Sequence, residues 1–296
     1  MKYVKLNNGI EMPILGFGVY QIPKEETKKC VLDAIKVGFR AIDTAQSYFN
    51  ESEVGDAIVE CGLPREELFI TTKVWIDNYG YENCKKSVME SLRKLKTDYI
   101  DLVLLHQPFS DYYGAYRTLE ELYEEGKIRA IGVSNFYPDR LTDICLFNRH
   151  VVPVINQVEV DPLNAQLEAQ ENMEKYGVKM EAWAPFGEGR NGLFTNEVLV
   201  SIGKKYNKSS AQVMLRWLIQ RGVIIVCKST HIERMKENFN VFDFELSEDD
   251  MQEISKLDTS NSLFFNHQDS KMVEWFDNIV KSRRENEDCR NDKKNW

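Results

Sequence analysis

Short apolar runs alternate along the chain with longer stretches in which hydrophobic residues recur at intervals of three and four. The longer stretches predict amphipathic helices, and the short runs are typical of strands that are buried on both faces. Helical patterns of this kind lie at 24–38, 81–95 and 112–127, and the first and third end at or beside a glycine with a lysine or arginine close by. The predicted strands cover residues 14–20, 41–45, 68–75, 102–108, 130–136, 154–160, 178–185 and 223–229.

Eight strands in strict alternation with helices predict a parallel sheet with right-handed crossovers. Eight such units in about 230 residues favour a closed (β/α)8 TIM barrel. An open dinucleotide-binding sheet would carry G-x-G-x-x-G after its first strand, and "GFGVYQ" has only the first two glycines. Residues 4–13, "VKLNNGIEMP", predict a β-hairpin with its turn at Asn8-Gly9, which would cap the N-terminal mouth of the barrel.

Composition favours one globular domain over residues 1–280. The chain has 296 residues, of which 43% are hydrophobic, enough for a sizeable core. The tail at 281–296 is polar and of mixed charge, so we expect a flexible extension.

Charge and cysteine usage narrow the class of protein further. The formal net charge of -9 disfavours nucleic-acid binding, and no apolar run is long enough to cross a membrane. The start lacks the apolar segment of a signal peptide, and the six cysteines are scattered as in a reduced, cytoplasmic protein. The four histidines lack zinc-ligand spacing, so no metal site is expected.

Polar residues stand where three adjacent predicted strands end. Asp43 follows the second strand with Tyr48 just beyond it, Lys73 closes the third strand, and His106 closes the fourth. Each residue alone has a structural explanation, such as a surface lysine or a hydrogen-bonded core histidine. Chemistry in such barrels collects at the carboxyl ends of the strands, so all four together indicate an active site. Asn50 is predicted to cap a helix that starts near Glu51.

These residue types suit the protonation of an oxygen atom. A free phenol has a pKa near 10, and a neighbouring cation favours the phenolate. We expect Lys73, held by Asp43, to lower the pKa of Tyr48 by about two to three units, which is ~3–4 kcal/mol. Tyr48 would then be a proton donor near neutral pH, and a ring N–H of His106 could orient a substrate oxygen.

Three long segments of the chain resemble signatures of the aldo-keto reductase family. They are "GFRAIDTAQSYFNESEVGDAI", "EEGKIRAIGVSNF" and "IIVCKSTHIERMKENFNVFDFELSEDD", in the order and on the barrel units where the family has them. The likeness covers residues 1 to about 279. The short connecting loops and "LDTSNSLFFNH" are most similar to microbial members of the diketogluconate reductase type.

The resemblance implies roles for individual residues. The tetrad would be Asp43, Tyr48, Lys73 and His106, with Tyr48 as the proton donor. NADPH would be the cofactor, with NADH as an alternative, and it would be bound without a Rossmann domain. The matching cofactor contacts are Ser134, Asn135 and Gln157 at the nicotinamide carboxamide, Trp183 on its ring, Lys228, Ser229 and Arg234 at the 2′-phosphate, and Glu237 and Asn238 at the adenine. A lysine, an arginine and a hydroxyl at a helix start also form a phosphate site on physical grounds.

Departures from the family pattern lie near the expected substrate pocket and leave the substrate undefined. Gln107 stands where many members have Trp, Val19-Tyr20 where Thr-Trp is frequent, and Phe49 where Gly is common after the tyrosine. The residues expected to wall the pocket are Tyr20, Trp75, Phe109 and residues 263–266.

The function predicted is NADPH-dependent reduction of a small aldehyde or ketone by a monomer or weak homodimer. Two alternatives differ from it. A short-chain dehydrogenase would use Y-x-x-x-K, which "YENCK" and "YEEGK" match, but both lie in charged amphipathic helices and the glycine-rich turn is missing. A non-catalytic, NADPH-binding regulatory subunit would share the fold and the cofactor site, and the intact tetrad favours the enzyme.

Overall fold

The structure is a computed structural model that describes residues 1–148 and 150–292. The described chain divides into two compact units, one of residues Met1–Leu263 and one that begins at Phe264. The first unit contains the predicted tetrad, the predicted cofactor contacts and most of the predicted pocket residues, whereas residues 264–266 belong to the second unit. Each unit is described by itself below.

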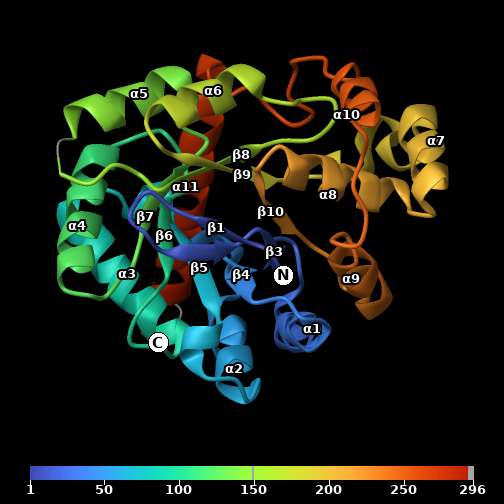
Figure 1. Ribbon diagram of the computed structural model, residues 1–296. Helices are drawn as coiled ribbons and strands as arrows, with labels where there is room; N and C mark the ends of the chain where they lie inside the picture. The colour runs from blue at the N-terminus through green and yellow to red at the C-terminus, as the bar shows by residue number, and fades with distance from the viewer. Residues whose placement is uncertain (149, 293–296) are drawn as a thin grey trace. The chain divides into compact units, whose positions relative to one another are not determined.

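Eight parallel strands close into a barrel in the order β10-β3-β4-β5-β6-β7-β8-β9, as predicted (Figure 1). Strands such as "LVLL" and "IGVS" are buried at every position, because neighbouring strands and helices cover both of their faces. The register places Asp43 beside Thr71 and Lys73 beside Leu104, so the ends of neighbouring strands lie at one rim. The barrel strands are β3 (Leu15–Gly18), β4 (Ala41–Asp43), β5 (Phe69–Val74), β6 (Leu102–Leu105), β7 (Ile131–Ser134), β8 (Ile155–Glu159), β9 (Lys179–Trp183) and β10 (Ile224–Cys227).

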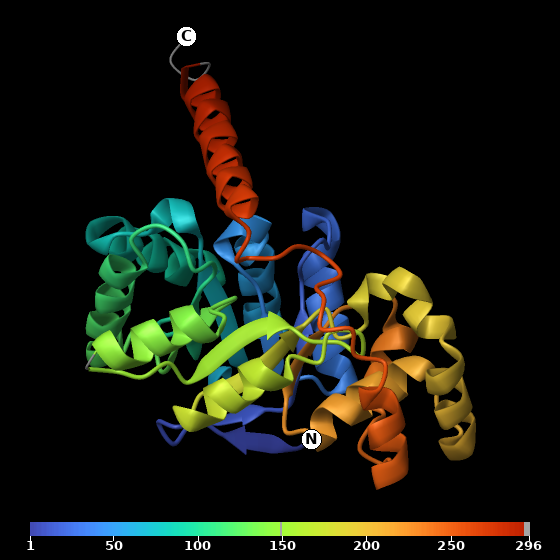
Figure 2. The same ribbon diagram turned by 90° about the horizontal axis from the view of Figure 1, so that it is seen from above.

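Helices surround the strands (Figures 1 and 2). The buried positions of α1 and α3 recur at intervals of three and four, as expected for helices that pack one apolar side against the barrel. Helix α8 starts with a capping box, in which Ser209 and Gln212 satisfy each other's backbone N–H groups. The helices of the first unit are α1 (Lys24–Val37), α2 (Glu51–Glu60), α3 (Tyr81–Leu95), α4 (Tyr112–Glu124), α5 (Pro138–Phe147), α6 (Leu167–Lys175), α7 (Glu197–Tyr206), α8 (Ser210–Gln220), α9 (Ile232–Phe239) and α10 (Glu248–Ser255), with short 3-10 segments η1 (Gln46–Tyr48), η2 (Arg65–Glu67), η3 (Ile76–Asn78) and η4 (Gly187–Thr195).

The predicted hairpin is present and closes the N-terminal end of the barrel. Strands β1 (Tyr3–Lys5) and β2 (Glu11–Pro13) pair antiparallel, and Gly9 in the turn adopts a φ of +89°. Leu6 and Met12 are buried in a cluster with residues at the starts of the barrel strands, among them Ala41 and Phe69. Because apolar side chains fill this end of the barrel, we expect the active site at the opposite rim, where the strands end.

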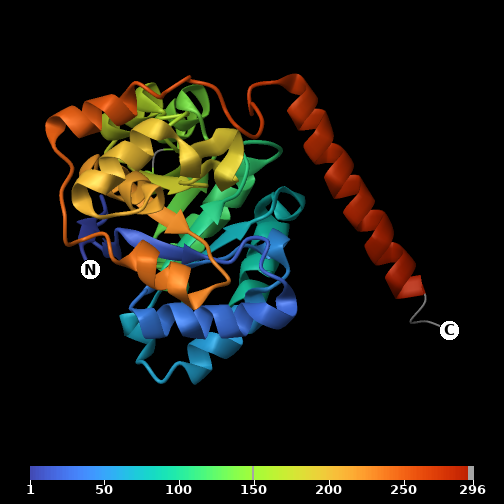
Figure 3. The same cartoon turned by 90° about the vertical axis from the view of Figure 1, so that its right-hand side faces the viewer.

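The C-terminal unit contains α11 (Ser270–Asp292), which is drawn as one continuous helix in Figure 3. It includes the first part of the stretch 281–296, whose flexibility stays a prediction. Residues 293–296 lie outside the described residues. No helix in the described part of the chain is both long and apolar enough to cross a membrane.

Candidate active site

The four strand-end residues meet at one rim of the barrel. Asp43 is the last residue of β4, Tyr48 lies in η1 directly after it, Lys73 is near the end of β5, and His106 follows β6. The Lys73 side chain is fully buried, and Asp43 and His106 are at most 9% exposed. A lysine is buried in this way only where partners satisfy its charge and its N–H groups.

Lys73 has such a partner for each of its three N–H donors. Its Nζ lies 2.5 Å from Asp43 Oδ1, 3.1 Å from Tyr48 Oη and 3.2 Å from the carbonyl oxygen of Thr44. The ammonium group therefore cannot turn away from the phenol without losing a hydrogen bond. The phenol oxygen accepts a charge-assisted hydrogen bond, the arrangement that stabilises a phenolate.

The pKa of Tyr48 in this structure corrects one expectation from the sequence. Burial raises the pKa of Tyr48 to about 12, although Lys73 acts to lower it. For Lys73, burial by itself lowers the pKa, but attraction to Asp43 and Tyr48 outweighs it and the net pKa is raised. Tyr48 is thus a neutral phenol beside a firmly protonated ammonium group at neutral pH.

A neutral phenol at this position is still a competent acid. A developing alkoxide is a far stronger base than a phenolate, because its conjugate acid, an alcohol, has a pKa comparable to that of water and far above that of a phenol. Proton transfer from Tyr48 to an alkoxide would therefore be downhill even with its raised pKa. Lys73 would stabilise the phenolate that remains.

The loop that carries Tyr48 is anchored by Asn50. The sequence predicted a side-chain cap for α2, and Asn50 does stand at the N-cap position, but its side chain makes no capping hydrogen bond. Instead, Asn50 accepts a hydrogen bond from Thr44 Oγ1 and donates to the carbonyl oxygen of Val19, both at 3.0 Å. These tertiary bonds replace the local cap and tie the loop after β4 to the loop after β3.

His106 lies edge-on against the Tyr48 ring, with centroids 5.7 Å apart. Trp75 also packs edge-on against the histidine, with ring centroids 5.2 Å apart. The ring Nδ1 lies 3.4 Å from Ser47 Oγ, a long hydrogen bond to a residue that the sequence analysis did not single out. The imidazole is thus positioned beside the phenol by two aromatic contacts and a hydroxyl.

The predicted nicotinamide contacts form a connected hydrogen-bond network beside Lys73. Asn135, held at a φ of +63°, donates to the carbonyl oxygen of His106 and to Ser134 Oγ, both at 3.1 Å. Trp183 Nε1 donates to Asn135 Oδ1 at 2.9 Å. Gln157 Nε2 donates to Asp43 Oδ2 at 2.9 Å. These contacts join the residues expected at the nicotinamide directly to the tetrad.

The predicted phosphate contacts lie at the junction of β10 and α9. Lys228 and Arg234 are exposed, and neither forms an ion pair with any residue that the structure describes. Ser229 is buried, and its Oγ accepts a hydrogen bond from His231 N at 3.0 Å. Two unpaired cations beside a helix start suit a phosphate group.

The two predicted adenine contacts already have partners within the protein. Glu237 Oε1 accepts a hydrogen bond from Ser209 Oγ. Asn238 is buried, and its Nδ2 lies 3.9 Å from Cys227 Sγ. Their partners link both side chains to α8 and β10, which leaves Lys228 and Arg234 as the two exposed charges at the junction that form no ion pair with the described residues.

Two of the predicted pocket residues, Tyr20 and Trp75, flank the tetrad. The ring of Tyr20 is 53% exposed and lies 4.9 Å from that of Tyr48, and Trp75 is buried against His106. Phe109 is half-buried in the loop between β6 and α4. Phe49 is 63% exposed and adopts a left-handed φ of +61°, which explains why glycine would suit this position.

One carboxyl group near the tetrad was missed by the sequence analysis. Glu181, in the middle of β9, is 1% exposed and accepts a hydrogen bond from Gln157 Nε2 at 2.9 Å. The signal was present in "VKMEAWAP", where an acid interrupts an apolar strand. Because Glu181 lies within the strand, the rule that places active-site residues at strand ends does not select it.

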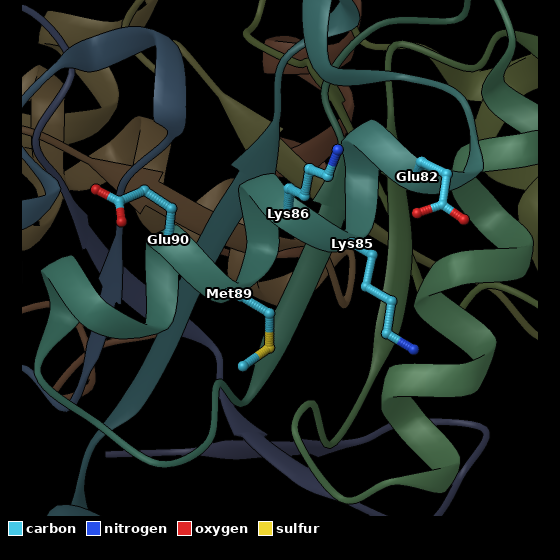
Figure 4. A pocket seen from close by; sticks show the side chains of 5 residues that line it. All are labelled: Glu82, Lys85, Lys86, Met89 and Glu90. Carbon is cyan, nitrogen blue, oxygen red and sulfur yellow. The ribbon is translucent and has the colours of Figure 1, made fainter.

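A hollow of about 460 Å³ lies on the outer face of α3 (Figure 4). It is lined by Glu82, Lys85, Lys86, Met89 and Glu90. Lys85 is paired with Glu121 of α4 and with Glu125 directly after that helix. None of the tetrad residues borders the hollow. Within the described residues, no group of three or more His, Cys, Asp or Glu side chains is placed to hold a metal ion.

Comparisons with known proteins agree with this geometry. The model of the Aldo/keto reductase family matches residues 14–259. Glyoxal reductase of Bacillus subtilis is 47% identical over 256 residues, covering 86% of this chain and 92% of that protein. Methylglyoxal reductase DkgA of Escherichia coli is 40% identical over 263 residues, covering 88% and 94%. The crystal structure of a Bombyx mori aldo-keto reductase in complex with NADP has a TM-score of 0.84 and 33% identity, covering 89% of this chain and 95% of that one. The chain therefore belongs to the aldo-keto reductase family and is an oxidoreductase that acts on carbonyl and alcohol groups.

Proposed function

We propose that this protein reduces small aldehydes and ketones, with glyoxal-like dicarbonyls as the first candidates, using NADPH and with Tyr48 as the proton donor. The observation that carries the proposal is the hydrogen bond of 3.1 Å from the buried Lys73 ammonium group to the Tyr48 hydroxyl. Relatives named for glyoxal and methylglyoxal reduction support the substrate class.

The residues present fit a phosphorylated nicotinamide dinucleotide. Lys228 and Arg234 supply charge that nothing in the described chain neutralises, as a 2′-phosphate requires. Trp183 is half-buried at the rim, and its N–H is fixed by Asn135, so its ring can support a planar group. When bound, NADPH would supply a hydride to the carbonyl carbon.

The protein's own groups would act on the carbonyl oxygen. The imidazole of His106, fixed beside the phenol, would orient that oxygen toward Tyr48. Tyr48 would transfer its hydroxyl proton to the oxygen as negative charge develops there. Lys73, held by Asp43, would stabilise the resulting phenolate. The aromatic rings of Tyr20 and Trp75 would limit the access of water.

Steady-state kinetics of Tyr48→Phe test the proposal. Oxidation of NADPH is followed by its absorbance with a panel of dicarbonyls, aldehydes and ketones, and NADPH binding is measured by tryptophan fluorescence. We expect wild-type turnover to fall by at least about 10³-fold in Tyr48→Phe while NADPH binding is unchanged. Tyr113→Phe on α4 removes a hydroxyl outside the site and should retain activity.

Two outcomes would contradict the proposal. Substantial turnover by Tyr48→Phe would exclude the phenol as the donor. A wild-type protein that binds NADPH but reduces no carbonyl of the panel would favour a regulatory, non-catalytic subunit. The monomeric or weakly dimeric state and the cytoplasmic location also stay predictions, to be measured by sedimentation and by imaging.

A further inference from the structure

Glu181 is a buried carboxyl group for which the mechanism above has no use. It lies in the middle of β9, in register with Gln157 of β8 and Ile224 of β10. Its Oε2 accepts a hydrogen bond from Gln157 Nε2, and its Oε1 is buried without a hydrogen-bond partner among the described residues. No lysine or arginine of the described chain forms an ion pair with it. A carboxylate in such surroundings would be costly to bury.

The charges that face Glu181 favour its protonated form. Burial, followed by repulsion from Asp43 of β4, raises the pKa of Glu181 to about 8, although Gln157 and Lys73 of β5 act to lower it. All three N–H groups of Lys73 are hydrogen-bonded, to Asp43, Tyr48 and Thr44, so none is left for Glu181. At neutral pH, Glu181 is therefore an uncharged acid, and the cluster around Lys73 carries a single negative carboxylate.

Glu181 and Asp43 together occupy both N–H groups of the Gln157 amide. Gln157 Nε2 lies 2.9 Å from Asp43 Oδ2 and 2.9 Å from Glu181 Oε2. A primary amide has two N–H donors, so the nitrogen is saturated. A flipped amide would place its oxygen against two carboxyl groups, one of them ionised and unable to donate. The side-chain oxygen of Gln157, Oε1, is thereby turned away from both carboxyl groups, and it accepts no hydrogen bond from the described residues.

We infer that Glu181 is a positioning residue that, with Asp43, locks the Gln157 amide so that its oxygen accepts an N–H of the nicotinamide carboxamide. The inference rests on the proposed function, because it needs a nicotinamide at this rim. Gln157 is the group that touches the cofactor, and Glu181 acts through it. Asp43 thereby serves two groups, the ammonium of Lys73 through one oxygen and the Gln157 amide through the other.

Equilibrium binding tests the inference without turnover. Dissociation constants for NADP⁺ and for its 3-acetylpyridine analogue, which has a methyl group in place of the carboxamide nitrogen, are measured by calorimetry. Wild type should prefer NADP⁺. Glu181→Leu, which removes the acceptor, should reduce that preference by about tenfold, the value of one hydrogen bond. Glu181→Gln, which keeps an acceptor oxygen, should retain the preference within about twofold.

A matched control separates positioning from general loosening. Glu120 of α4 is also a buried acid that accepts two hydrogen bonds, but it is linked to Asn148 and Val151 and not to Gln157. Glu120→Gln should leave the preference unchanged even if it lowers stability. If Glu181 had only a structural role, its replacement would weaken the binding of NADP⁺ and of the analogue by the same factor.

Each result has a definite meaning. An unchanged preference in Glu181→Leu, or a wild type that does not distinguish the two dinucleotides, would overturn the inference. If Glu181→Leu does not fold, Glu181→Met decides the question in the same assay. Failure of the wild type to bind NADP⁺ at all would overturn the proposed function itself, a distinct outcome.

Discussion

Replacing Lys73 by methionine should show how much its charge contributes to kcat and how much it contributes to the free energy of unfolding. The ammonium nitrogen lies 3.1 Å from the phenol oxygen. At an effective dielectric constant of about 20, Coulomb's law gives a stabilisation of roughly 5 kcal/mol for a phenolate at that distance. The Asp43 carboxylate offsets part of this, so we expect kcat to fall by about 10³-fold in Lys73→Met.

The same substitution leaves the Asp43 carboxylate buried without its cation. Breaking a buried ion pair by removing one partner costs about 3–5 kcal/mol of unfolding free energy. In Lys73→Met with Asp43→Asn, the residue at position 43 is neutral and can still meet the Gln157 amide. The double variant should therefore recover most of the lost stability and none of the lost activity.

The assays are urea unfolding followed by circular dichroism and the NADPH-coupled carbonyl assay on the same preparations. A single variant that keeps more than about a tenth of wild-type kcat would show that the cation is not needed to stabilise the phenolate. A double variant that is less stable than Lys73→Met alone would show that the loss did not come from an unpaired carboxylate.

Three further expectations follow from single contacts. Because burial raises the pKa of Glu181 from 4.5 to about 8, the folded wild type binds the proton more tightly than the unfolded chain. Wild-type stability should thus fall as pH rises from about 4.5 to 8, and the stability of Glu181→Gln relative to wild type, measured by urea unfolding, should rise over that window by up to about 5 kcal/mol. Arg234→Ala should raise KM for NADPH by about 10- to 100-fold and change KM for NADH little, because only NADPH has a 2′-phosphate that loses its charged partner. Equal increases in the two KM values, measured by steady-state kinetics, would contradict the assigned contact. Asn50→Ala should cost about 2–3 kcal/mol of unfolding free energy and lower kcat, because the loop carrying Tyr48 loses its tie to Val19; a fully active variant would refute the anchoring role.

The barrel and the meeting of the four strand-end residues could be predicted because they follow from local rules. Residues 102–105, "LVLL", are apolar at every position, as a parallel strand covered on both faces must be. Once eight such strands alternate with helices, closure places all strand ends at one rim. Asp43 and Lys73 then meet whatever the exact loop conformations.

The details that the sequence did not predict depend on three-dimensional burial. Asn50 has the residue type and position of a helix cap, but partners from Thr44 and Val19 compete for its side chain. The pKa of Tyr48 is raised because desolvation exceeds the attraction of Lys73, a balance that no spacing of residues reveals. In the sequence, Glu181 is an isolated acid within a strand. Its role becomes visible only when its neighbour across the sheet, Gln157, is known.

Closure of the barrel also constrains how the chain can be made. Strand β3 pairs with β4 on one edge and with β10 on the other. The β10 edge can form only after Val226, the partner of Gly16, has been synthesised. During vectorial synthesis, the first barrel strand has an unpaired edge until more than 200 further residues have left the ribosome. Such edges invite intermolecular pairing, and contacts of this sequence separation form slowly. Protection of that edge in the nascent chain, by a chaperone or by rapid local collapse, is thus a requirement of the fold.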